Sequence, residues 1–347
     1  MIKSIKQHDR IVSLDIIRGL ALFGILFINI AGYKVLVEGG PMPDTTGINS
    51  LINASIDVLI QKKFFSIFSF LFGVGFYIFA SRAELRGDKP RLLFARRLLT
   101  LFLIGVVQVF FFPGTILPIY AIIGLFLIPF FKATNRTIVI WLLSITAFYV
   151  FSLIILLSGF TSGLIYDVAS LIGTDATLIF IMFLAGFLSA KANWLRQIQR
   201  LKSYLKWIGI ITLPLFVFSS YWIWKASIQN SELIDQIIGI GTIPTVLLYL
   251  VTLFTILENG YIRRLLMPIA RVGQMALTNY FAQSFIGLAL MALIGIDVVS
   301  ATDIVVIAPI IFAIHIVTSY IWFNFFKMGP LEMVWRFMTY GKNPKRT

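Results

Sequence analysis

Long apolar stretches alternate with short polar and basic segments along the whole chain. A membrane-spanning helix needs about 20 mostly apolar residues. This criterion predicts ten spans, at about 17–36, 64–82, 93–112, 115–132, 137–158, 176–190, 206–226, 237–257, 273–295 and 304–326. A Phe-Pro-Gly turn at 112–114 joins the third span to the fourth. The pattern therefore predicts an all-helical, polytopic membrane bundle of about ten transmembrane helices.

The basic residues give this bundle an orientation. With the spans placed as above, all but four of the 29 lysines and arginines fall on one side. The four on the other side are Lys34, Lys62, Lys63 and Lys225. Because basic loops resist translocation across a membrane, we expect both termini to be cytoplasmic. The net charge of +14 is then a consequence of topology next to anionic lipids, and no nucleic-acid partner is expected.

The segments between the spans predict further elements. A stretch from Ile48 to Ile60 in the longest outer loop predicts a short re-entrant or interfacial helix. Residues 191–206 form a basic interfacial linker between spans 1–6, at about 12–190, and the remainder, 207–347. After Pro330, the i, i+4 pair Glu332 and Arg336 with Trp335 predicts an amphipathic helix that covers the inner face. We expect one integral membrane domain over residues 1–347.

Composition excludes several function classes. The chain is 59% hydrophobic and 13% charged, whereas a soluble domain carries about 25% charged residues, so no room remains for a large soluble domain. It has no cysteine, which excludes disulfides, thiolate metal sites and a cysteine nucleophile. Two histidines, His8 and His315, leave little material for a metal site, and none is expected. The first apolar stretch lacks a cleavage pattern and is predicted to be a retained span.

Two ionisable residues, Asp15 and Arg18, stand at the start of the first span. Such groups at the edge of the hydrocarbon usually face a partner, a cavity or a substrate. Three positions apart on a helix, they share one face, and the simplest interpretation is an ion pair that anchors the span. The alternative adds Arg96 and Arg97, which open the third span on the same side. Three arginines at one level could hold a phosphate-bearing ligand, although anchoring also explains Arg96 and Arg97.

Polar residues inside the spans are the other candidates for a site. They are Lys62 and Lys63 at the second span, Gln108, Thr115 and Tyr120 in the third and fourth, Thr278, Asn279 and Gln283 in the ninth, and His315 in the tenth. Each neutral residue either bonds to a neighbouring helix or contacts a polar ligand, and the lysines either snorkel or act chemically. His315 is the one histidine that could act as a base inside the membrane, but no acid lies within a helical turn of it.

Five segments taken together resemble the YeiB-like family of bacterial inner-membrane proteins. They are Leu14-Asp15-x-x-Arg18-Gly19 with Asn29, Lys63-Phe64 through Gly75-Phe76, Ile116-Leu117 with Tyr120-Ala121, Gly273 through Ser284, and Gly329-Pro330-Leu331-Glu332 through Tyr340. The resemblance runs from residue 14 to 340 and implies a multi-pass protein of the bacterial cytoplasmic membrane.

That family is similar in turn to membrane acyltransferases, including heparan-alpha-glucosaminide N-acetyltransferase and bacterial O-acyltransferases of envelope sugars. The resemblance implies transfer from cytosolic acyl-CoA or acetyl-CoA to an envelope sugar, lipid or small metabolite. Arg18, Arg96 and Arg97 would hold the CoA phosphates. The substrate would contact residues among Asn29, Gln108, Thr115, Tyr120, Thr278, Asn279 and Gln283. Membrane lipids are the expected partners, and a homodimer is compatible with this layout.

The chain departs from the acyltransferase pattern in its acid–base residues. The acetyltransferases use a histidine near the first two spans, and this chain has none between His8 and His315. A histidine and an aspartate that often occur in the third and fourth spans are replaced by Gln108 and Thr115. Chemistry would then run through His315, Lys63 or Asp15. The alternatives are a transporter or flippase for a small polar or lipid-linked substrate, or an inactive lipid-binding protein.

Overall fold

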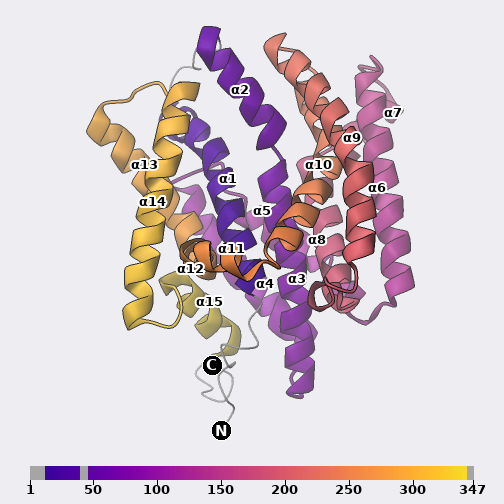
Figure 1. Cartoon of the computed structure of the whole chain (residues 1–347), viewed down its shortest axis with the longest axis vertical. Helices are drawn as coiled ribbons and strands as arrows, with labels where there is room; N and C mark the ends of the chain where they lie inside the picture. Colours follow the sequence, from indigo (N-terminus) through magenta and orange to yellow (C-terminus); the bar gives the residue numbers. More distant parts are fainter. Residues whose placement is uncertain (1–11, 40–45, 342–347) are drawn as a thin grey trace.

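The computed structural model describes residues 12–39 and 46–341, and all regular structure within them is helical (Figure 1). The α-helices are α1 (Val12–Glu38), α2 (Gly47–Leu59), α3 (Lys63–Leu85), α4 (Pro90–Val109), α5 (Leu117–Leu125), α6 (Asn135–Leu157), α7 (Leu164–Ile172), α8 (Asp175–Lys191), α9 (Lys202–Ile228), α10 (Ile234–Ile256), α11 (Gly260–Leu265), α12 (Met267–Gln274), α13 (Ala276–Ile294), α14 (Ala301–Phe325) and α15 (Pro330–Tyr340). Two short 3₁₀ helices are η2 (Ile128–Lys132) and η3 (Trp194–Arg196). His8 and both termini, predicted to be cytoplasmic, lie outside the described residues.

The predicted membrane bundle is confirmed, with fewer spans than ten. Among the described residues, eight helical segments are long and apolar enough to cross a membrane. A ninth is obtained if α7 and α8, which meet at a bend of 48°, count as one span. The eight are α1, the continuous pair α2 and α3, α4, α6, α9, α10, α13 and α14. Every predicted span except the fourth coincides with one of these nine segments.

The predicted fourth span is interrupted. Residues 115–132 form the nine-residue α5 and the 3₁₀ helix η2. Nine residues of helix extend only about 14 Å, which is too short for a hydrocarbon core of about 30 Å. Pro129, the second residue of η2, has no backbone N–H to donate and prevents α5 from continuing. Non-helical backbone at membrane depth is tolerated where protein covers it or where it lines a cavity, and α5 does line one, as described below.

Contacts between distant segments place the two sets of loops at opposite ends of the bundle. At one end, the ammonium of Lys62 pairs with Asp175 at 2.8 Å and with Asp235 at 2.7 Å. The starts of α3, α8 and α10 therefore meet there, beside α2 at the top of Figure 1. At the other end, Trp335 of α15 donates a hydrogen bond to the carbonyl of Arg97 in α4. This alternation agrees with the predicted spans, and placing the arginine-rich end in the cytoplasm stays a prediction from the charge pattern.

Glycines allow a close helix crossing between α3 and α8. A Cβ added at Gly73 would meet the carbonyl oxygen of Phe183, and one added at Gly186 would meet that of Phe70. The rings of Phe72 and Phe183 stack beside this crossing with their centroids 4.5 Å apart. The interpretation of the glycines in the second span as close helix contacts is thus confirmed for Gly73.

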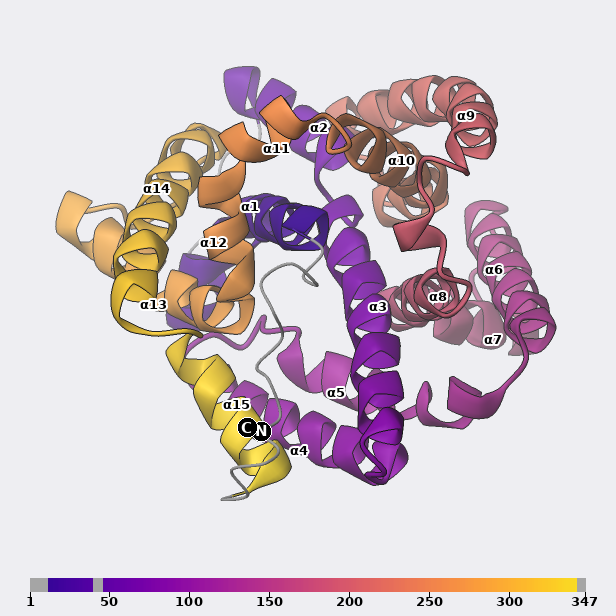
Figure 2. The same cartoon turned by 60° about the horizontal axis from the view of Figure 1, so that its bottom comes forward.

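Two of the elements predicted outside the spans are present. The outer helix expected from Ile48 to Ile60 is α2, and the amphipathic helix expected after Pro330 is α15. The segment 191–206 leaves α8 through η3 and enters α9 at Lys202. Viewed from the end that carries α15, helices α1, α3, α4, α5, α12, α13 and α15 surround the central region of one half of the molecule (Figure 2).

Candidate functional site

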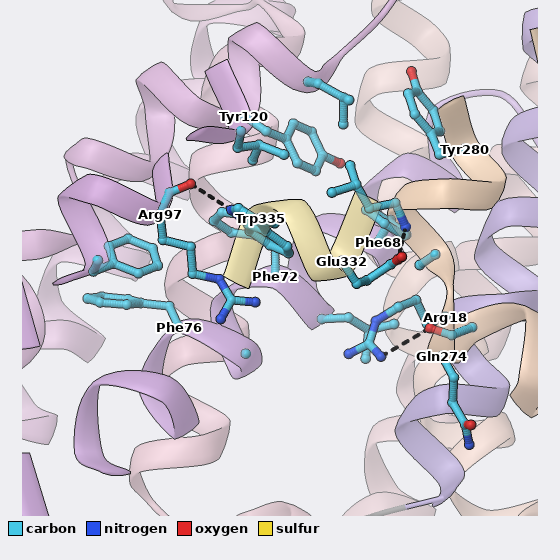
Figure 3. Close-up of a pocket in the computed structure, with 18 residues that line it drawn as sticks. Arg18, Phe68, Phe72, Phe76, Arg97, Tyr120, Gln274, Tyr280, Glu332 and Trp335 are labelled. Carbon is cyan, nitrogen blue, oxygen red and sulfur yellow. Dashed lines mark hydrogen bonds between the residues drawn. The ribbon is translucent and has the colours of Figure 1, made fainter. Parts of the chain in front are cut away.

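A cavity of about 230 Å³ lies at the arginine-rich end of the bundle, among those surrounding helices. Its lining comes from α1, α3, α4, α5, α13 and α15 and from the junction of α12 with α13 (Figure 3). The lining residues are Arg18, Phe68, Leu71, Phe72, Gly75, Phe76, Phe94, Arg97, Leu101, Leu117, Tyr120, Gly273, Gln274, Ala276, Leu277, Tyr280, Glu332 and Trp335. Two arginines, an aromatic wall and two tyrosines thus share one space.

Arg97 is held in place by aromatic rings, and its N–H donors are not used in hydrogen bonds to other described residues. Its guanidinium carbon lies 3.8 Å from the ring centroid of Trp335 and 4.8 Å from that of Phe79. Trp335 also donates from Nε1 to the carbonyl oxygen of Arg97 at 2.7 Å. Within the described part of the chain, the guanidinium makes no hydrogen bond or ion pair, so its five N–H donors are available to a ligand. Stacking orients the guanidinium while leaving its edge open to an anion.

Arg18 approaches the same cavity from the α1 side. Its Nη1 donates to Oδ1 of Asp15 at 2.8 Å and to the carbonyl oxygen of Gly273 at 3.4 Å. The Asp15 side chain is 5% exposed, while that of Arg18 is 27% exposed. The predicted i, i+3 ion pair is therefore present. Asp15 fixes one edge of the guanidinium, and Arg18 lines the cavity beside it.

Helix α15 forms the floor between the two arginines, as Figure 3 shows. Oε1 of Glu332 accepts from the backbone nitrogens of Leu277 (2.8 Å) and Thr278 (3.3 Å), and Oε2 accepts from the Thr278 hydroxyl (2.5 Å). The first N–H groups of a helix lack intrahelical acceptors, and a carboxylate there also complements the helix dipole. Glu332 thus caps α13 and fixes α15 beneath the cavity.

We expect Glu332→Gln to lower the thermal unfolding midpoint of the purified protein. A neutral amide loses the charge in three hydrogen bonds to α13, and hydrogen bonds to charged groups contribute about 1.5–3 kcal/mol each. The matched control is Glu84→Gln, because Glu84 is exposed in the last turn of α3. Equal midpoints for the two variants would contradict the capping role.

The deep end of the cavity is polar but uncharged. The Tyr120 hydroxyl lies 2.6 Å from Oγ of Ser69 and donates to the carbonyl oxygen of Phe65 at 2.9 Å. The Tyr280 hydroxyl accepts from the backbone nitrogen of Ile116 at 3.1 Å. Between this end and the arginines the wall is mostly phenylalanine and leucine. The cavity is therefore amphipathic, with cationic groups at one end, an apolar body and hydroxyl groups at the other.

Several predicted site residues hold helices together instead. Thr115 donates to Oε1 of Gln108 at 2.9 Å, and Gln108 donates to Oγ of Ser284 at 3.4 Å. This neutral pair fastens the turn between α4 and α5 onto α13. Asn279 donates to the carbonyl oxygen of Val272 and to Oγ of Ser319. These interactions match the helix-contact interpretation of the polar residues.

Other predicted residues lie away from the cavity. Arg96 is exposed, although its neighbour Arg97 lines the cavity, and Arg336 lies on α15 outside the lining. Lys63 is fully buried at the opposite end, where its ammonium donates to the carbonyl oxygen of Asp57. The remaining three, Asn29, Gln283 and His315, are buried in α1, α13 and α14 and are absent from the lining.

The aromatic wall is the part of the site that the sequence did not reveal. Phe68, Phe72 and Phe76 occur at a spacing of four residues, so they share one face of α3. This spacing could have indicated an aromatic face lining a site, but it is equally typical of a helix face that packs against its neighbours. Tyr280, which stands between the polar residues Asn279 and Gln283 in the sequence, also lines the cavity.

A second cavity of about 230 Å³ lies near the opposite end of the bundle. It is lined by residues of α2, of α9 and of the loop and helix that follow: Ser50, Asn53, Ile56, Asp57, Ser227, Asn230 and Ile234. Ser227 donates to Oδ2 of Asp57 at 2.7 Å. This cavity is polar and contains no arginine in its lining, in contrast to the first.

Comparisons with known proteins identify relatives along the whole chain. The family described as "Protein of unknown function (DUF418)" matches residues 189–342, which include Tyr280, Glu332 and Trp335. An "Uncharacterized 39.9 kDa protein in amylase 3'region" of Bacillus acidopullulyticus is 31% identical, over 97% of this chain and 96% of that protein. YxaH of Bacillus subtilis is 28% identical (96% and 95% covered), and YeiB of Escherichia coli is 24% identical (95% and 96% covered). No solved structure matches the chain.

Proposed function

The chain belongs to the YeiB-like (DUF418) family of membrane proteins, and we propose that its arginine-ended cavity binds cytosolic acyl-CoA as the donor for a transmembrane acyltransferase. The acceptor would be an envelope sugar, a lipid or a small metabolite. The bacterial relatives support a location in the cytoplasmic membrane. The observation that carries the proposal is the amphipathic cavity, in which Arg18 and Arg97 stand at one end of an aromatic passage.

The charge distribution fits a donor with phosphates at one end. Guanidinium groups bind phosphate by paired hydrogen bonds, and Arg97 has no anionic partner among the described residues. The aromatic body suits the apolar part of an acyl-bearing arm. Binding sites for drug-sized molecules span about 300–1,000 Å³, so a cavity of about 230 Å³ takes only part of a CoA molecule. The acyl-bearing arm would occupy the cavity, and the nucleotide would remain at the mouth.

The second cavity offers a place for a polar acceptor on the other side. Asp57 lines it, and the Asp57 carbonyl accepts from Lys63. From Lys63 to Phe68, which lines the first cavity, α3 rises by five residues, or about 7.5 Å. A short barrier that includes the buried Lys63 would thus separate donor from acceptor, and transfer would require a local opening of this barrier.

The transporter alternative receives less support from the geometry. That alternative requires Asn279, Gln283 and His315 to line a polar cavity in the middle of the membrane. Asn279 is bonded within the helix bundle, and none of the three lines either described cavity. The first cavity is cationic at one end and apolar in its body, which favours an anionic amphiphile.

The test is isothermal titration of the purified protein with acetyl-CoA, CoA and inorganic pyrophosphate. We expect both CoA compounds to bind, and pyrophosphate to bind more weakly because it lacks the arm. Arg97→Gln should weaken acetyl-CoA binding by about 10-fold to 100-fold, because a hydrogen bond to a charged group contributes about 1.5–3 kcal/mol.

Arg96→Gln is the matched control. It removes the same charge one residue away, where the side chain is exposed and outside the cavity. Equal losses in the two variants would show that general charge, and not this cavity, attracts the ligand. Absence of any binding of acetyl-CoA would overturn the proposed function, and tight binding of pyrophosphate alone would point to a lipid phosphate instead.

A further inference from the structure

Four buried polar atoms without a hydrogen-bond partner are concentrated in three helices. Among the described residues, six buried side-chain atoms lack a partner. Four of them belong to Asn29 (Nδ2) and Tyr33 (OH) in α1, Gln283 (Nε2) in α13 and His315 (Nε2) in α14. An unsatisfied buried donor or acceptor costs about 1–3 kcal/mol, and native proteins satisfy nearly all of them. Their concentration in one region therefore indicates a shared binding partner.

The register of α13 against α14 places Gln283 opposite His315. Asn279 bonds to Ser319 at 3.0 Å, and a Cβ added at Gly287 would lie 3.5 Å from the side chain of Ile311. The two contacts are two turns apart on each helix and run in opposite directions, as expected for consecutive antiparallel spans. On α13, Gln283 lies midway between Asn279 and Gly287. On α14, His315 lies midway between Ile311 and Ser319. The two side chains consequently share one level of the membrane.

Helix α1 brings Asn29 and Tyr33 to the same place. The Cβ added at Gly287 would also meet the ring of Tyr33, so these two residues are in contact. Helices α1 and α13 run in the same direction. Asn29 lies one turn before Tyr33, and Gln283 lies one turn before Gly287, so Asn29 and Gln283 are at the same level. The side chain of Asn29 also lies near the hydroxyl of Tyr280, which lines the first cavity. The group therefore begins where the deep end of the cavity stops.

The chemistry of the group selects a small, uncharged occupant. The amide nitrogens of Asn29 and Gln283 donate, whereas the Tyr33 hydroxyl and a histidine nitrogen can donate or accept. No carboxylate, lysine or arginine belongs to the group, so a bound ion would have no counter-charge in a medium of low dielectric. All four residues are at least nine-tenths buried, so an occupant would have to be about the size of water.

We propose that Asn29, Tyr33, Gln283 and His315 hold a cluster of bound water between α1, α13 and α14, and that this water connects Tyr280 at the cavity to His315. Its use rests on the proposed acyl transfer. When an acceptor hydroxyl attacks a thioester, its O–H bond breaks, the new C–O bond forms and the C–S bond breaks. The water would carry the released proton to Nε2 of His315 and return it to the thiolate, so that a free thiol leaves. His315 would then replace the acid–base pair that Gln108 and Thr115 do not provide.

Radiolytic hydroxyl labelling of the full chain in lipid vesicles, read by mass spectrometry, tests the water cluster directly. Radicals formed from bound water label buried side chains next to it. We expect Tyr33 and His315 to be labelled several-fold faster than Met182, a buried residue of the apolar core around α8. Methionine is intrinsically reactive, which makes Met182 a strict control. Labelling of Tyr33 and His315 no faster than that of Met182 would overturn the proposal.

A pair of variants at one position separates water binding from simple packing. His315→Gln keeps a hydrogen-bonding group, so labelling of Tyr33 should persist. His315→Phe removes it, and labelling of Tyr33 should fall while the unfolding midpoint decreases. A higher midpoint for His315→Phe would mean that the region is dry and would contradict the proposal. Because labelling requires neither acyl-CoA nor an acceptor, this proposal and the proposed function can fail independently.

Discussion

A Gly75→Leu variant is expected to fold normally and to lose acetyl-CoA binding by at least about 100-fold, a loss of about 2.7 kcal/mol. Gly75 lines the first cavity, and a Cβ added there meets no atom within 4 Å. A leucine side chain would therefore extend into the cavity without displacing a helix. Because leucine favours helical backbone by up to about 1 kcal/mol relative to glycine, the stability of the fold should be maintained.

Titration calorimetry and the thermal unfolding midpoint, measured on the same preparation, give the two readouts for Gly75→Leu. Gly75→Ala is the graded control, because a single methyl group fills little of a cavity of about 230 Å³. It should retain most of the binding. Full acetyl-CoA binding by Gly75→Leu would mean that the ligand site lies elsewhere, whereas a collapse of the unfolding midpoint would mean that the space beside Gly75 is needed by the fold.

A Gly73→Leu variant, with the same substitution two residues before Gly75, is expected to fail to fold. At Gly73 an added Cβ would overlap the carbonyl oxygen of Phe183, which is backbone and cannot turn away as a side chain can. Overpacking of a core by small groups typically costs about 1–3 kcal/mol, and here two helix backbones would have to separate. We expect Gly73→Ala to lower the unfolding midpoint by several degrees and Gly73→Leu to give little monodisperse protein in size-exclusion chromatography.

Gly75→Leu serves as the control for Gly73→Leu, because it adds the same apolar volume to the same helix. A wild-type unfolding midpoint for Gly73→Leu would contradict the close crossing of α3 and α8. The two glycines therefore test opposite parts of the structure, since one permits helix contact and the other leaves space for a ligand.

The apolar pattern was sufficient to predict most of the fold. Runs of about 20 apolar residues require helices in a membrane, because only internal hydrogen bonds satisfy the backbone there. Lys62 also supported the topology, since it lies at one end with Asp175 and Asp235, as the alternation requires. The fourth span could not be predicted by hydropathy alone. Its apolar composition persists through Pro118 and Pro129, but Pro129 prevents the helix from continuing. Surrounding protein covers the interrupted backbone there.

The site was only partly accessible from the sequence. Arg18 was identifiable because a charge at the edge of a span needs a partner. Arg96 and Arg97 could not be distinguished, because adjacent helical positions point about 100° apart and only the neighbouring helices determine which one faces inward. Trp335 and Phe79, which hold Arg97, come from distant parts of the chain. Gln108 and Asn279 likewise bond to residues that are distant in the sequence. The sequence alone therefore left open whether these two side chains contact another helix or a ligand.

The most direct test of the central claim is a cryo-electron microscopy structure of the protein saturated with acetyl-CoA. We expect phosphate density at the mouth between Arg18 and Arg97, with the thioester end directed past the aromatic wall toward Tyr120 and Tyr280. Acetyl-CoA bound on another face, or a first cavity without ligand density at saturating concentration, would contradict it.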